Sequence, residues 1–238
     1  MSSPSRSMMA IAMLAFASIP SAALSSTIET TLDVLIDVSS DVLVVTVTEG
    51  RTNSNGGDCG FVYTAKVNKQ FKGKTQEDIE FGTMEGLSIG KTYFLALYDR
   101  NAYIAERTGI LNFTFANHSE DERKRAMTKW NGCQKFIPRR MVGGWELGAM
   151  PVVRAPDIDY KIAVKVPLLS IRIPSGTICT QAASVDQYDR GLDTVWVTLP
   201  EMERVTMNAI ERKVGATQAS DKRQNSLTFR ECAIPDDK

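Results

Sequence analysis

The chain has 238 residues, with 28 Lys and Arg against 28 Asp and Glu, and a single histidine. Its length fits one or two domains, and its 43% hydrophobic and 24% charged residues are typical of a folded protein rather than a disordered one. A balanced charge lacks the excess of cations that nucleic-acid binding requires, so we exclude that class of partner. One histidine also excludes metal sites and mechanisms that need two imidazoles.

The first 25 residues have the features of a secretory signal peptide. Arg6 supplies positive charge, residues 8–19 form an apolar run, and small residues follow up to Ser25. The apolar run is shorter than the roughly 20 residues that span a bilayer as a helix. No later stretch is apolar enough to span a membrane. We therefore expect an exported mature protein, extracellular, or periplasmic if the host is a Gram-negative bacterium.

Export determines how the four cysteines, Cys59, Cys133, Cys179 and Cys232, are interpreted. An even number in an oxidising compartment predicts two disulfides, and the residues alone leave three pairings open. Their spacing lacks the CxxC pairs of a zinc site. Because Cys59 and Cys133 flank most of the barrel predicted below, we favour a bond between them and a second bond between Cys179 and Cys232.

Residues 26–133 predict a mainly β domain, a five-stranded OB-like barrel with a short closing helix. The expected strands are rich in Val, Tyr, Phe and Thr, and turn residues separate them. They are residues 41–49, 61–71, 78–84, 91–98 and 102–110. Ser119 and Glu122 form a capping box that starts the helix, and Gly132 is its expected end. An OB-type barrel has this strand count.

The remaining residues, 134–238, predict a smaller α+β region whose role the sequence does not indicate. Its expected strands are residues 161–173 and 193–198. Pro167 is expected to split the first strand or confine it to a sheet edge, because proline cannot donate a ladder hydrogen bond. A second helix is expected between Thr198 and Gly215.

The motif Gly86-Leu-Ser88-Ile-Gly90 matches the G-x-S-x-G pattern of serine hydrolases. That pattern needs a strand before it, a helix after it and a histidine later in the chain. Here a strand is expected after the motif, and the only histidine, His118, lies at a helix start. We therefore interpret Ser88 as a turn residue and predict that the protein is not an enzyme.

Two glycosylation sequons, Asn112-Phe-Thr114 and Asn117-His-Ser119, surround this histidine. They mark the segment as surface, and Asn112 and Asn117 are expected glycosylation sites if the host glycosylates its exported proteins.

A series of short motifs resembles the netrin-like domain. The motifs are Asp41-Val-Leu-Val-Val45, Phe71-Lys-Gly73, Asp78-Ile-Glu-Phe81, Leu87-x-x-Gly90-Lys-x-Tyr93 and a helix that ends in Trp130-Asn-Gly132-Cys133. Within that group they are most similar to the tissue inhibitors of metalloproteinases. The inhibitory domain of that family also closes with a short helix ending in an aromatic residue, a glycine and a cysteine. The resemblance covers about residues 26–133, half of the chain.

The resemblance implies a protein that inhibits a secreted zinc metalloproteinase. In that family the free amine and carbonyl of the first mature residue chelate the protease's zinc, and the second side chain enters the specificity pocket. The protease-binding residues implied in this way are Ser26, Thr27, Ile28, Met84, Glu85 and Gly86. The chain itself is expected to hold no metal and no cofactor, and its zinc contact would be made by the Ser26 backbone.

Two other functions stay open. The family fixes its N-terminus with disulfides, whereas this sequence has no cysteine between Ser26 and Asp58. The first alternative is therefore a netrin-like module that binds another extracellular protein and inhibits nothing. The second is a secreted enzyme centred on residues 134–238.

Overall fold

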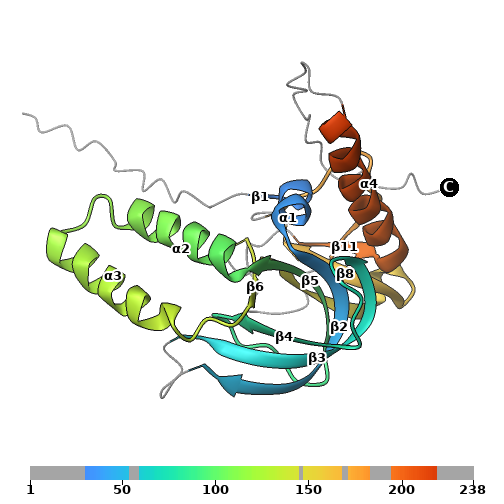
Figure 1. The fold of residues 1–238 in the computed structure, drawn as a ribbon. Helices are drawn as coiled ribbons and strands as arrows, with labels where there is room; N and C mark the ends of the chain where they lie inside the picture. Colours follow the sequence, from blue (N-terminus) through green and yellow to red (C-terminus); the bar gives the residue numbers. More distant parts are fainter. Residues whose placement is uncertain (1–29, 54–58, 145–146, 168–170, 183–193, 219–238) are drawn as a thin grey trace, which may run out of the picture.

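The computed structural model describes residues 30–53, 59–144, 147–167, 171–182 and 194–218. Within these residues the protein is mainly β, with a closed five-stranded barrel, helices after it and a sheet that continues from one barrel strand (Figure 1). The predicted signal peptide lies outside the described residues. None of the described helices is long and apolar enough to cross a membrane.

The barrel is the OB-like barrel that the sequence predicts. Its strands are β2 (Asp41–Thr52), β3 (Phe61–Lys72), β4 (Asp78–Thr83), β5 (Thr92–Asp99) and β6 (Arg140–Val142). Their order is β5-β2-β3-β4-β6, and β6 also pairs with β5, which closes the barrel. Every neighbouring pair is antiparallel except β4 and β6, which run parallel. Four of the five strands are at the predicted positions.

The prediction of the fifth strand is wrong. Residues 102–110 belong to helix α2 (Arg100–Thr114). The helix begins here because Asp99 Oδ1 accepts hydrogen bonds from the backbone N–H groups of Asn101 and Ala102, as an N-cap residue does. The closing strand is the three-residue β6 instead, which comes from beyond residue 133.

Helices α2 and α3 (Glu120–Gln134) form a hairpin that extends from one side of the barrel (Figure 1). The predicted capping box of Ser119 and Glu122 is present. The helix passes its predicted end at Gly132 and finishes at Gln134, and Cys133 in its last turn is buried and bonded to Cys59.

The sheet continues beyond the barrel from β5. Strands β7 (Ala149–Ala155), β8 (Lys161–Pro167), β11 (Thr194–Thr198) and the short β10 (Thr180–Gln181) follow in that order, and a 3-10 turn, η1 (Pro156–Ile158), lies between β7 and β8. As predicted, the strand that starts at Lys161 ends at Pro167. A separate parallel pair joins β1 (Thr30–Thr31) to β9 (Ile171–Arg172).

Helices α1 (Leu32–Val38) and α4 (Leu199–Gln218) lie side by side near these strands (Figure 1). α4 starts directly after Thr198 as predicted, but its predicted end at Gly215 is wrong, since it continues to Gln218. A glycine inside a helix costs only about 1 kcal/mol, which the packing of the rest of the helix offsets.

The described residues form two large apolar cores and one small cluster of Ala155, Ala163 and Trp196. One large core fills the barrel and includes Leu43, Phe81 and Leu95. The other lies between the opposite face of the sheet and the helices, where Val164 and Val197 contact residues of α4 such as Met202. Ion pairs also hold α4 in place, from Lys69 to Glu203 and from Arg212 to Asp33 at 2.9 Å.

Candidate protein-binding site

The candidate site is the β4–β5 loop, residues 84–91, which connects two barrel strands. It contains the predicted residues Met84, Glu85 and Gly86, which lie together as consecutive residues. Glu85, Gly86 and Ser88 are exposed, and the side chain of Ile89 is 61% exposed. The loop therefore offers an isoleucine, a carboxylate and open backbone to a partner.

Two buried tyrosines hold the middle of this loop. The Leu87 N–H donates to the hydroxyl oxygen of Tyr63 at 2.7 Å, and the Ser88 N–H donates to the hydroxyl oxygen of Tyr93 at 3.0 Å. Both tyrosines belong to the barrel core. A buried tyrosine needs a partner for its hydroxyl, and here the loop backbone supplies that partner.

Both ends of the loop are fixed as well. At the start, the Glu85 N–H donates to Thr83 Oγ1 at 3.0 Å. At the end, the Gly90 N–H donates to the Val47 carbonyl at 2.7 Å, and the Val47 N–H donates to the Lys91 carbonyl at 3.0 Å. Gly90 has a φ of +80°, which a glycine adopts without strain. The loop is exposed, and its backbone is hydrogen-bonded to the barrel at its start, middle and end.

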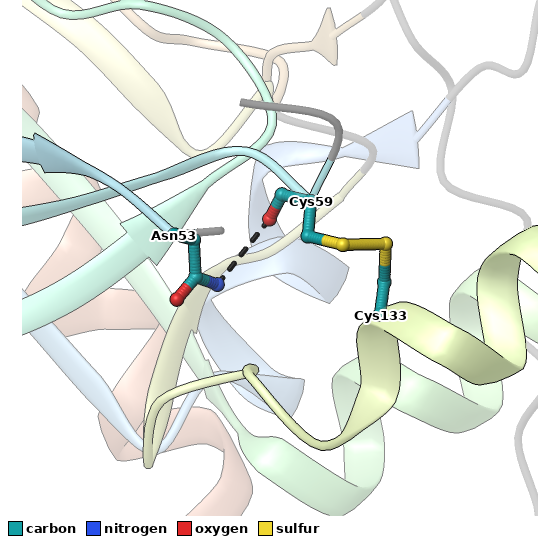
Figure 2. The surroundings of a disulfide bond; sticks show 3 residues. All are labelled: Asn53, Cys59 and Cys133. Carbon is teal, nitrogen blue, oxygen red and sulfur yellow. Dashed lines mark hydrogen bonds between the residues drawn. A yellow bond between two sulfur atoms is a disulfide. The ribbon is translucent and has the colours of Figure 1, made fainter. Parts of the chain in front are cut away.

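A disulfide lies at the same end of the barrel. Cys59, just before β3, is bonded to Cys133 in the last turn of α3, with 5.2 Å between the Cα atoms (Figure 2). Figure 2 also shows Asn53 Nδ2 donating to the Cys59 carbonyl at 3.3 Å. The predicted pairing of Cys59 with Cys133 is confirmed, and the bond joins the α2–α3 hairpin to the barrel.

Gly60 connects the disulfide to the candidate loop. Its φ is +81°, and a Cβ at this position would overlap the Thr83 carbonyl oxygen and lie 3.1 Å from Met84 Sδ. Only glycine allows this close approach. Met84 packs against the buried cluster that contains Cys59 and Cys133, so the start of the loop is attached to the core on the side of the barrel where Gly60 follows Cys59.

The other predicted protease-binding residues, Ser26, Thr27 and Ile28, lie outside the described residues. The described part of the chain begins at Thr30, which pairs with Ile171 of β9. The barrel loop and this N-terminal strand are therefore held by different parts of the fold.

The second predicted disulfide is only partly described. Cys179 is 2% exposed and takes part in a disulfide, whereas Cys232 lies outside the described residues. The two sequon residues are both exposed, Asn112 within α2 and Asn117 in the connection between α2 and α3.

Ser88 lies in the loop before strand β5, and no helix follows it. The prediction that Ser88 is a turn residue is confirmed. His118 lies at the far connection between α2 and α3, where its ring contacts Phe115 with 5.0 Å between centroids. Among the described residues, no group of three or more His, Cys, Asp or Glu is placed to hold a metal ion.

Sequence reasoning missed the roles of Tyr63 and Tyr93. Each lies at a core-facing strand position, which signals burial, but the partner of its hydroxyl is set by the three-dimensional path of a loop. No local pattern identifies such a partner.

No family model matches this sequence, and no curated protein matches it significantly.

Proposed function

We propose that this protein binds another protein through the β4–β5 loop, and that its target is a secreted zinc metalloproteinase, which it inhibits. One observation carries this proposal: Ile89 and its neighbours are exposed while the loop backbone is bound to Tyr63 and Tyr93. Ordering a loop on binding costs roughly 1–2 kcal/mol per residue, and a loop that is already ordered avoids this cost.

The choice of target rests on the resemblance to the tissue inhibitors of metalloproteinases. The catalytic zinc of such a protease keeps one open coordination position. In the proposed complex the amine and carbonyl of Ser26 approach this position, Thr27 enters the specificity pocket, and Met84, Glu85 and Gly86 contact the adjacent rim. Gly60, the residue after the disulfide-bonded Cys59, lies close to Met84, which supports a fixed position for the start of the rim.

The experiment compares four proteins against a panel of secreted zinc endopeptidases: the chain starting at Ser26, the same chain with one added alanine, and Ile89→Asp and Ile178→Asp in the first background. The added alanine displaces both zinc donors and should abolish inhibition. Ile89→Asp should weaken inhibition at least tenfold. Ile178→Asp is the matched control, because Ile178 is 60% exposed but lies outside the loop.

Equal inhibition by the native and extended starts would show that Ser26 is not the zinc donor. Equal inhibition by Ile89→Asp and Ile178→Asp would show that the loop does not contact the protease. The absence of inhibition by all four folded proteins would remove the protease as target.

One observation favours a second candidate, a netrin-like module that binds an extracellular protein without inhibiting a protease. Thr30 pairs with Ile171 of β9 rather than with a barrel strand, so the N-terminal strand is not part of the barrel that carries the loop. In this case partner binding depends on Ile89 and is unaffected by the added alanine, which distinguishes the two functions.

A further inference from the structure

Four exposed side chains lie together at the base of the α2–α3 hairpin, where α2 begins, α3 ends and β6 starts (Figure 1). They are Arg100, Lys135, Phe136 and Arg139, and we call them the hairpin-base patch. Phe136 is 41% exposed, and Lys135 Nζ lies 4.8 Å from the centroid of its ring. Arg100 Nη2 donates to the carbonyl of Gln134, the residue before Lys135, at 2.9 Å. The patch therefore combines an exposed aromatic ring with three cations.

The backbone that carries the patch is fixed by the fold. The Phe136 N–H donates to the Cys133 carbonyl at 2.9 Å, and Ile137, the next residue, is buried. The Arg100 N–H donates to the Arg139 carbonyl at 3.0 Å, which joins the start of α2 to the segment before β6. A partner that binds here therefore does not have to order this backbone, and the conformational entropy of ordering it is not lost on binding.

The charges of the patch are not balanced within the described part of the chain. Asp99 of β5 faces Arg140 of β6, and the next position along the two strands places Arg100 opposite Arg139. Like charges that face each other directly are destabilising. Neither Arg100 nor Arg139 forms an ion pair with a described carboxylate, since Asp41 is paired with Arg140 and Asp99 Oδ1 accepts from the N–H groups at the start of α2. An acidic group supplied by a partner would offset this repulsion.

The patch borders the β4–β5 loop. Pro138, in the segment between α3 and β6, packs on Gly82 of β4, since a Cβ at Gly82 would lie 2.8 Å from Pro138 Cγ. β4 ends at Thr83, and the loop starts at Met84. The segment that carries three of the four patch residues therefore lies against the strand that leads into the loop, and one partner can cover both.

We propose that the hairpin-base patch binds an acidic segment of the protein that occupies the β4–β5 loop. This segment has carboxylates on either side of an apolar side chain. The apolar group packs on Phe136, and the carboxylates pair with the cations, since a guanidinium binds a carboxylate through two parallel hydrogen bonds. A sulfated glycan would match the charges, but the adjoining loop and the exposed ring favour a protein. The inference rests on the proposed binding function of the loop but does not require a protease as the target.

NMR titration of the oxidised chain starting at Ser26 tests the proposal with the peptide Glu-Leu-Glu-Glu-Leu-Glu. The amide signals of the patch should shift on binding. Lys135→Glu/Arg139→Glu should weaken binding roughly tenfold, because it replaces two attractive contacts with repulsive ones. Arg123→Glu/Lys124→Glu is the matched control, with the same change of charge at two exposed α3 residues about 17 Å away along the helix. It should leave the affinity unchanged.

Equal affinity of the two double variants would overturn the proposal, and so would equal binding of the uncharged peptide Gln-Leu-Gln-Gln-Leu-Gln. Salt provides a readout that does not depend on any variant folding. Raising NaCl from about 0.1 M to about 1 M shortens the Debye length from about 10 Å to about 3 Å and should weaken wild-type binding severalfold. Unchanged affinity at high salt would contradict recognition by charge. Tighter binding of a heparin hexasaccharide than of the acidic peptide would assign the patch to a sulfated glycan instead.

Ile89→Asp separates this inference from the function proposed for the loop. The variant should bind the acidic peptide as the wild type does, because Ile89 lies outside the patch. Peptide binding without inhibition of any protease would support the patch and remove the protease as target. Inhibition that depends on Ile89, without peptide binding, would support the loop and overturn the patch.

Discussion

Arg140 donates a hydrogen bond from Nε to Asp41 Oδ2 at 2.7 Å, and this ion pair joins the first residue of β6 to the first residue of β2. The Asp41 side chain is 5% exposed, and Ser40 Oγ donates to the same oxygen at 2.9 Å. Gly73, with a φ of +100°, lies against the other carboxylate oxygen, where a Cβ would overlap it. Because β6 has only three residues, this pair does much to hold the closing strand in position.

Arg140→Met should therefore lower the free energy of unfolding by about 3 kcal/mol, because it leaves a buried carboxylate without its charged partner. Urea denaturation measures this change. Arg139→Met is the control, since the Arg139 side chain is exposed and its replacement should change stability by less than about 0.5 kcal/mol. Equal effects of the two substitutions would show that the ion pair does not support the barrel.

Stability should fall at alkaline pH because of Tyr98. Burial raises the pKa of the Tyr98 phenol well above its usual value, and the Glu106 carboxylate raises it further. The folded state then retains a proton that the unfolded state releases near pH 10, so the stabilisation is complete below about pH 10 and is lost as the pH rises above it.

Urea unfolding between about pH 8 and pH 11 checks this prediction. Tyr98→Phe should flatten the alkaline loss of stability, whereas Tyr160→Phe, at a tyrosine that is 65% exposed, should leave it unchanged. If Tyr98→Phe and the wild type lose the same amount of stability at alkaline pH, a group other than Tyr98 causes that loss.

Removing the tyrosine hydroxyls should loosen the β4–β5 loop at separate points. Tyr63→Phe should speed hydrogen exchange of the Leu87 amide, and Tyr93→Phe should do the same for the Ser88 amide. Each substitution removes one hydrogen bond and should cost about 1 kcal/mol of stability. NMR exchange rates provide the measurement, and each variant serves as the control for the other. Unchanged rates would mean that these bonds do not hold the loop.

Breaking the Cys59–Cys133 disulfide should lower the free energy of unfolding by much more than either tyrosine substitution. The two cysteines are 74 positions apart, and a loop of that length corresponds to about 4 kcal/mol in the chain-entropy description. The double variant Cys59→Ala/Cys133→Ala should show this loss in urea denaturation. Peptide mapping of the non-reduced wild type should recover Cys59 with Cys133, and a peptide joining Cys59 to Cys179 would contradict the structure.

The sequence predicts the long barrel strands well because their signals are local. β2, β3, β4 and β5 are each rich in β-branched and aromatic residues and are bounded by turns. The same signal is misleading in α2, because Tyr103, Ile104 and Ile110 have strand propensity. The N-cap at Asp99 and the helical spacing of Tyr103 and Arg107 are the signals that identify a helix there.

Local sequence patterns do not predict β6 or the tyrosines that hold the β4–β5 loop, and the reason is different. Arg140–Val142 is too short to show a period, and it becomes a strand only because β4 and β5 leave an edge for it and Asp41 binds its first residue. The resemblance to a known family is what identifies Met84, Glu85 and Gly86 as candidate residues. The hydroxyls that hold this loop belong to Tyr63 and Tyr93, strand residues that no local pattern connects to it.

The pairing of strand β5 determines how the protein unfolds. β5 pairs with β2 along one edge, and along the other edge with β7 near its start and β6 near its end. A chain truncated after residue 133 would lack β6 and β7. Leu95 and Leu97 of β5, which are fully buried in the whole chain, would then lie at an unpaired strand edge. The barrel and the sheet that extends it thus share one cooperative unit, and heat or denaturant should melt them in a single transition.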